Sequence, residues 1–90
     1  MNNPQNKWLF YYQPNRQAAV RLFCFPYSGA GASLFLPWRS ILPKSIDLVP
    51  VQLPGRENRI GERPYTQLAP LVAAVAEAIR PFLDKPFAFF

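Results

Sequence analysis

A turn at positions 27–31, in which four small residues follow Tyr27, is the part of this chain best suited to bind an anion or an oxyanion. We call it the small-residue turn. The apolar run LFCFP at 22–26 leads directly into the sequence YSGAG. Its glycines let the backbone turn sharply, and Ser33 is a candidate N-cap for a following helix. A strand, a glycine-containing loop and a helix N-terminus in this order leave backbone amides available. Many α/β proteins bind an anion or an oxyanion with such a unit.

The one cysteine, Cys24, lies inside the apolar run and not in the turn. The chain contains no histidine to activate a thiol, so we interpret Cys24 as a small buried hydrophobe and not as a nucleophile. A single cysteine also excludes an internal disulfide framework. It is typical of a protein kept in a reducing compartment.

The elements that must position the turn alternate between strand and helix. We predict strands at residues 22–25, 47–53 and 87–90. The first has no polar alternation, which is typical of a parallel strand covered on both faces. Pro50 lacks a donor for the sheet and favours an edge or a bulge. The order predicts an α/β fold built from parallel βαβαβ units, with ligands bound at the carboxyl ends of the strands.

Two helices are expected between these strands, at residues 33–42 and 66–83. Apolar side chains recur there at spacings of three and four. Thr66 is the predicted N-cap of the longer helix, and Pro81 should loosen its end. Before the first strand, the aromatic run WLFYY at 8–12 predicts either a short edge strand or a segment packed over the sheet.

Composition limits the class of protein. Half of the residues are hydrophobic and 16% are aromatic, which indicates a substantial core. Ten Lys and Arg against five Asp and Glu leave a net charge of +5 without a dense basic stripe, so we expect no nucleic-acid partner. No apolar run approaches the roughly twenty residues that span a membrane, and no apolar leader is seen. We expect a cytoplasmic protein with no membrane partner.

Three segments together resemble the amino-terminal part of the type II thioesterases. They are LFCFPYSGAGAS at 22–33, VQLPGRENR at 51–59 and RPFLDKPFAFF at 80–90. Members of this family are stand-alone α/β-hydrolases that edit nonribosomal peptide and polyketide synthesis. The resemblance covers residues 8–90 and departs at Ala30, where the family more often has glycine. It implies that residues 1–90 form the amino-terminal part of a single α/β-hydrolase domain.

The resemblance also implies an activity for the complete protein. In the family, a strand like FAFF leads into a GHSMG nucleophile elbow, followed by the acid and the histidine of a triad. The sequence ends before this elbow, so the 90 residues alone cannot use the family's mechanism. The complete protein is expected to hydrolyse acyl or aminoacyl thioesters on the phosphopantetheine arm of an acyl or peptidyl carrier protein. No cofactor and no metal are implied.

Site residues follow from the same resemblance. The backbone N–H of Tyr27 or Ser28, with Ser28 favoured, is expected to donate to the oxyanion; the alternative is a plain tight turn. The three arginines of the polar loop at 54–65 are expected to contact the acidic carrier protein or its phosphate. They are Arg56, Arg59 and Arg63. The alternatives are a solvated loop, or a loop braced by Arg56 through Glu57 or Glu62.

Two other functions stay open at the level of sequence. One is a carboxylester hydrolase of the same fold, which a comparison of thioester with oxyester substrates would distinguish. The other is a non-catalytic module that binds a carrier protein through the arginine loop. This second function is favoured only if residue 90 is the true carboxyl terminus.

Overall fold

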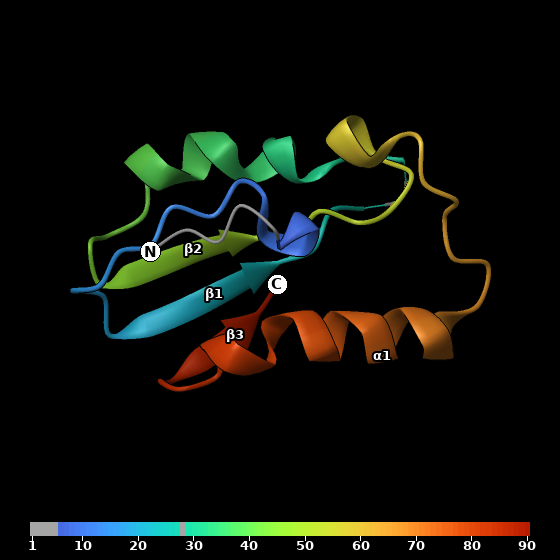
Figure 1. Cartoon of the computed structure of the whole chain (residues 1–90). Coiled ribbons are helices and arrows are strands. Elements are labelled where there is room, and N and C mark those ends of the chain that lie inside the picture. The colour runs from blue at the N-terminus through green and yellow to red at the C-terminus, as the bar shows by residue number, and fades with distance from the viewer. Residues whose placement is uncertain (1–5, 28) are drawn as a thin grey trace.

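A three-stranded parallel sheet forms the centre of the computed structural model, which describes residues 6–27 and 29–90. The strand order is β2-β1-β3, with β1 at Val20–Cys24, β2 at Ile46–Pro50 and β3 at Phe87–Phe89 (Figure 1). In this register Phe23 of β1 lies opposite Val49 and Phe89. The predicted α/β class with parallel strands is confirmed.

Strand β2 ends at Pro50, three residues earlier than expected, because the backbone beyond it soon forms hydrogen bonds outside the sheet. The Val51 amide still donates to the Cys24 carbonyl at 2.9 Å, but the Gln52 amide donates to the Trp8 carbonyl at 2.7 Å. Pro50 therefore occupies the last position of an edge strand of the described sheet, where its missing donor costs little.

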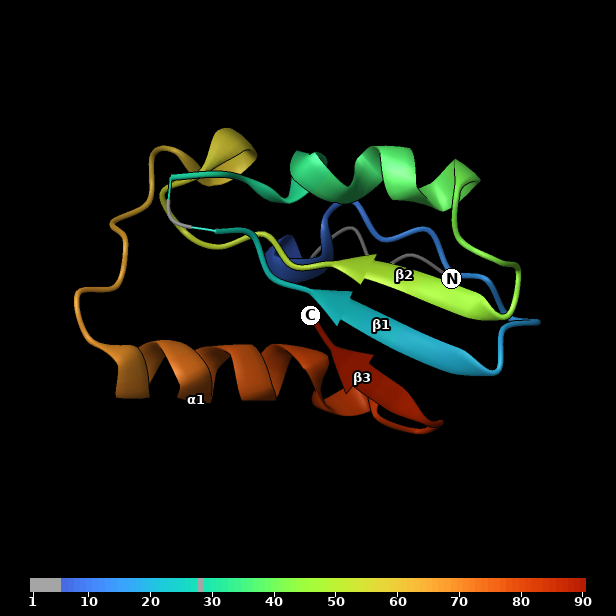
Figure 2. The same cartoon turned by 180° about the vertical axis from the view of Figure 1, so that it is seen from behind.

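The two crossovers cover opposite faces of the sheet (Figures 1 and 2). The chain passes from β1 outward to β2 and then back across β1 to β3, so right-handed connections must use both faces. Helix η2, at Ala32–Ser40, covers one face, and α1, at Leu68–Ile79, covers the other. The loops after β1 and β2 both leave the sheet at the carboxyl ends of the strands, which is where such folds bind ligands.

Helix η2 differs from the expected helix in its type and in its cap. It is a nine-residue 3-10 helix capped by Gly31, so the prediction of a Ser33 N-cap is wrong. Pro37 lies inside the helix, where it has no N–H to donate to an α-type bond. Side chains from the loop after β2 bind the amides of Ala32 and Ser33 and replace a local cap.

Helix α1 is shorter than the predicted 66–83. It begins after Gln67 as N-cap, not Thr66, and gives way at Arg80 to the short 3-10 helix η4, Arg80–Phe82, which contains Pro81. The expected loosening at Pro81 is confirmed. Ile79 is buried in the core, whereas Leu68 and Val72 near the amino end of α1 are exposed.

The amino-terminal segment packs over the sheet. A short 3-10 helix, η1 at Lys7–Leu9, brings Leu9 and Tyr12 into the core against Phe23 and Val49. This arrangement selects the packed segment over the edge strand. None of the described helices is long and apolar enough to cross a membrane.

A buried ion pair joins these elements at the amino ends of the strands, away from the small-residue turn. The Asp47 carboxylate is 1% exposed and accepts hydrogen bonds from the Tyr12 hydroxyl at 2.5 Å, the Asn15 amide at 3.0 Å and the Arg21 Nε at 3.2 Å. Burial, together with the bond to Asp47, raises the pKa of Tyr12 to about 12. We assign this cluster to stability because the Asp47 carboxylate is buried and bonded to three groups of the protein itself.

Candidate functional site

The small-residue turn lies at the carboxyl end of β1, beside the loop that follows β2 (Figure 2). The Ala30 amide donates to the Tyr27 carbonyl at 3.0 Å and closes the turn. Gly29 has a φ of +83°, a conformation that favours glycine. Tyr27 is 68% exposed, whereas Ser28, the favoured donor, lies outside the described residues. The two loops line a hollow of about 460 Å³.

Gln52 links the two loops from beneath. Its side chain is fully buried, and its Oε1 accepts a hydrogen bond from the Ala32 amide at 2.8 Å. Its Nε2 donates to Glu57 Oε1 at 3.0 Å and to Asn58 Oδ1 at 2.7 Å. One side-chain amide therefore binds the start of η2 and the loop after β2 at the same time.

Glu57 makes the second link between the loops. Its carboxylate accepts hydrogen bonds from the Ser33 amide at 3.1 Å and from the Ser33 hydroxyl, in addition to that from Gln52. Burial acts to raise the pKa of Glu57, but the hydrogen bonds from Ser33 and Gln52 outweigh it and hold the pKa below its usual value. The carboxylate thus stays charged beside the N-terminus of η2, where a negative charge is favourable.

Gly31 has no side chain and therefore leaves room for the Glu57 carboxylate. A Cβ at position 31 would lie 2.2 to 2.5 Å from the Glu57 side chain, so an alanine there would displace the carboxylate and break its hydrogen bonds. The two glycines of the turn therefore serve different purposes: Gly29 supplies a left-handed backbone, and Gly31 supplies space.

Arg56 braces the turn directly. Its Nη1 donates to the Ala30 carbonyl at 2.9 Å and approaches the Tyr27 carbonyl at 3.5 Å. The bracing considered from the sequence is thus seen, with carbonyls of the turn as the partners in place of Glu57 or Glu62.

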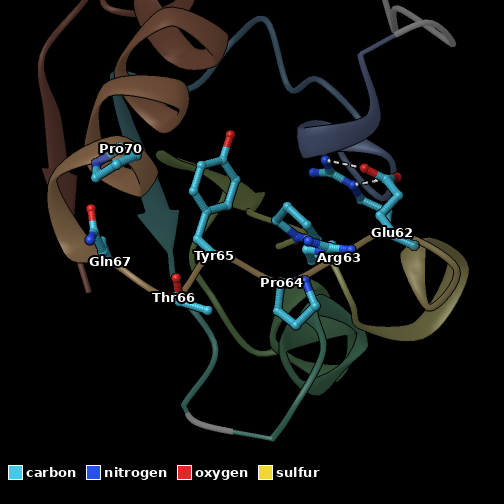
Figure 3. Close-up of a pocket in the computed structure, with 9 residues that line it drawn as sticks. Glu62, Arg63, Pro64, Tyr65, Thr66, Gln67 and Pro70 are labelled. Atoms are coloured by element: carbon cyan, nitrogen blue, oxygen red, sulfur yellow. Dashed lines mark hydrogen bonds and ion pairs between the residues drawn. The ribbon is translucent and has the colours of Figure 1, made fainter.

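Arg59 is buried, with 5% of its surface exposed. Its guanidinium lies 4.2 Å from the centre of the Trp8 ring and donates to the Gln52 carbonyl at 2.9 Å. It also donates to both oxygens of Glu62, the bonds marked in Figure 3, and these hold the pKa of Glu62 below its usual value. These contacts fix the loop after β2 to the amino-terminal segment.

Arg63 is exposed on the same loop. It lines a second hollow of about 480 Å³ together with Tyr65 and Gln67 (Figure 3). The structure thus distributes the three arginines: Arg56 lies against the turn, Arg59 inside the protein and Arg63 at the surface. Whether any of them contacts a carrier protein stays a prediction.

Sequence reasoning missed Gln52 and treated Glu57 only as a possible partner of Arg56. The available signal was a polar residue at the end of an apolar run, because a buried amide must find partners. Within the described residues, no cluster of three His, Cys, Asp or Glu side chains is arranged to hold a metal. The basic side chains that line the two hollows at this edge are those of Arg56, Arg59 and Arg63.

Comparisons with known proteins identify relatives of this chain. The family model described as Thioesterase domain matches residues 20–90. The gramicidin S biosynthesis protein GrsT of Aneurinibacillus migulanus is 50% identical over 84 residues, which cover 93% of this chain and 33% of that protein. The chain thus spans about a third of the length of such relatives.

Solved structures agree with this match. The RedJ thioesterase from the prodiginine pathway of Streptomyces coelicolor is 43% identical, with a TM-score of 0.77 over 87% of this chain and 30% of that chain. The type II thioesterase BorB from the borrelidin biosynthetic cluster is 28% identical, with a TM-score of 0.80 over 99% of this chain and 36% of that chain. The observed fold is accordingly that of part of an α/β-hydrolase.

Cys24 should be unreactive in the native protein. It is fully buried beside Phe35 and Leu48, and burial raises the pKa of its thiol to about 11. Because the thiolate is the reactive form, labelling by a thiol reagent at pH 8 should be slow and should accelerate on denaturation. Cys24→Ala should keep most of the activity of the complete protein. Rapid native labelling, or loss of activity at unchanged stability, would contradict this prediction.

Proposed function

Because this chain belongs to the thioesterase domain family, we propose that the complete protein hydrolyses acyl or aminoacyl thioesters held on the phosphopantetheine arm of carrier proteins. We place it among the editing enzymes of nonribosomal peptide or polyketide synthesis, acting in the cytoplasm. The observation that carries the proposal is the glycine turn at the end of the central strand, clamped by the loop after β2.

Hydrolysis of a thioester passes through a tetrahedral intermediate with a negatively charged oxygen. Donors held ready for that oxygen contribute a factor of about a hundred to a thousand in rate each. In our proposal the turn at 27–31 supplies one such donor, the backbone amide of Ser28 or Tyr27. Its place at the carboxyl ends of the strands, beside the loop that follows β2, supports this role.

We further propose that residues 1–90 are the amino-terminal part of a single domain, whose nucleophile, acid and histidine lie outside this chain. The Phe25 amide donates to the Phe90 carbonyl at 2.9 Å, so chain continuing from Phe90 would start beside the turn. An apolar groove between α1 and β3, lined by Leu68, Val72 and Phe89, supports coverage by further chain.

For the carrier protein we propose contact through the exposed Arg63 and the partly exposed Arg56. Carrier proteins of this class are acidic, and their prosthetic arm bears a phosphate that a guanidinium binds through paired donors. Arg59 would contribute indirectly, because its donors already bind Gln52 and Glu62.

The test of the function uses the complete protein and one acyl group presented in two ways. The acyl thioester on a carrier protein should be hydrolysed with a higher kcat/KM than the matching oxyester. Preference for the oxyester would support a carboxylester hydrolase. Binding of the carrier without turnover of either substrate would support a non-catalytic module.

Substitution of Ser28 separates the backbone from the side chain. Ser28→Ala keeps the amide, so kcat/KM on an acyl thioester should fall by less than about threefold. Ser28→Pro removes the donor and restrains φ, and kcat/KM should fall by about a hundredfold or more. Equal damage from both substitutions in folded protein would assign the chemistry to the hydroxyl. If neither substitution had an effect, the donor would be Tyr27 or a residue outside the turn.

Substitution of Arg63 tests the carrier contact. Arg63→Ala should raise KM for the carrier-bound thioester by about three- to tenfold and lower its dependence on salt, because a charge pair at the rim is lost. KM for a small thioester of the same acyl group should not change. Arg80→Ala, which removes an exposed arginine from the end of α1, is the matched control. Equal effects of the two variants on the carrier substrate would contradict the assignment.

A further inference from the structure

The side chain of Gln52 is buried beneath two neighbouring loops, which follow the carboxyl ends of β1 and β2. Burial of an amide is costly unless its oxygen and nitrogen are both bonded. The structure satisfies both, with the Ala32 amide on one side and Glu57 and Asn58 on the other. Moving either loop relative to the other would break at least one of these bonds. Gln52 is therefore a cross-link between the turn region and the loop after β2.

Glu57 also binds the start of η2, and its own backbone is strained. Its φ of +46° lies in the left-handed region, which is unfavourable for a residue with a side chain. Such strain persists only where the surroundings over-determine it, and it is found preferentially at functional sites. Here the strained residue carries a carboxylate that binds the Ser33 amide and hydroxyl and that fits against Gly31.

We infer that Gln52 and Glu57 are positioning residues for the proposed hydrolysis. They hold residues 31–33, which directly follow the part of the turn that carries the proposed donor. This inference rests on the proposed function and adds two residues that act through the backbone of another segment. The bonds to Ala32 and Ser33 come from side chains 20 and 24 residues away, so their loss would free the turn without removing any donor.

The chemistry of position 52 supplies a specific test. A glutamine offers an acceptor to Ala32 and a donor to Glu57, whereas an ionised glutamate offers only acceptors and faces a second carboxylate. A protonated glutamate again offers both. Gln52→Glu should therefore damage the site at high pH and recover as the introduced carboxyl takes up a proton. Burial beside Glu57 raises the pKa of such a group, so the recovery should begin above the pH at which an exposed carboxyl group takes up its proton.

In the complete enzyme, Gln52→Glu should lower kcat on an acyl thioester by about ten- to a hundredfold at pH 8, with KM within about twofold of wild type. The ratio of variant to wild-type kcat should rise as the pH falls toward 6. A purely structural role would instead lower the fraction of folded protein, and kcat per folded molecule would match that of the wild type. Loss in KM alone, or a ratio independent of pH, would overturn the inference.

Variants of Glu57 give an independent comparison. Glu57→Gln keeps the acceptor for Ser33 and Gln52 and can donate to the Ser33 hydroxyl, so kcat should stay within about threefold of wild type. Glu57→Ala removes the brace, and kcat should fall by about tenfold or more. Glu77→Ala, in an exposed ion pair on α1, is the control and should have no effect. Equal kcat values for the alanine and glutamine variants at position 57 would overturn the inference.

Amide hydrogen exchange measures the strength of the hydrogen bonds to Ala32 and Ser33 without relying on turnover. Exchange of the amides of Ala32 and Ser33 should accelerate in Glu57→Ala and, at pH 8, in Gln52→Glu, but not in Glu57→Gln. Unchanged exchange in the first two variants would overturn the inference even if activity fell. Wild-type protein that hydrolyses no thioester would overturn the proposed function itself. Active wild type with unaffected variants would overturn only the positioning role.

Discussion

The geometry of the candidate site depends on one buried amide, the side chain of Gln52. Leaving such a group without partners costs about 1–3 kcal/mol, so the chain around it must supply them. Pairing in β2 stops at Pro50, the Gln52 backbone amide turns to Trp8, and Arg59 binds the Gln52 carbonyl. Gln52, two residues beyond the end of β2, thus forms hydrogen bonds with the amino-terminal segment and with both loops.

Position 30 shows how the turn tolerates a departure from the family pattern. The resemblance predicts glycine at position 30, but the φ of Ala30 is not in the left-handed region, so alanine fits without strain. The conformational demand falls on Gly29 and the steric demand on Gly31. The backbone of Ala30 serves instead as a partner, donating to Tyr27 and accepting from Arg56.

The arginines of the polar loop show why charge alone does not define a binding surface. The three residues lie within eight positions of one another and look equivalent in the sequence. In the folded protein Arg59 lies on the Trp8 ring, Arg56 binds carbonyls of the turn, and Arg63 is exposed. A guanidinium whose donors are already occupied inside the protein has little capacity for a partner, whereas an exposed one keeps all of them.

The sequence by itself determined the order of strands and helices, the parallel sheet, the glycine turn and the burial of Cys24. Apolar periodicity and turn residues report local preferences, and these agreed with the fold. Only the tertiary structure decided the early end of β2, the capping of η2 and the roles of Gln52 and Arg59. The reason is physical: a buried polar group takes its partner from whatever lies beside it in space. Here those partners are Ala32 for Gln52 and Ser33 for Glu57, 20 and 24 residues away, beyond the range over which a sequence pattern carries information.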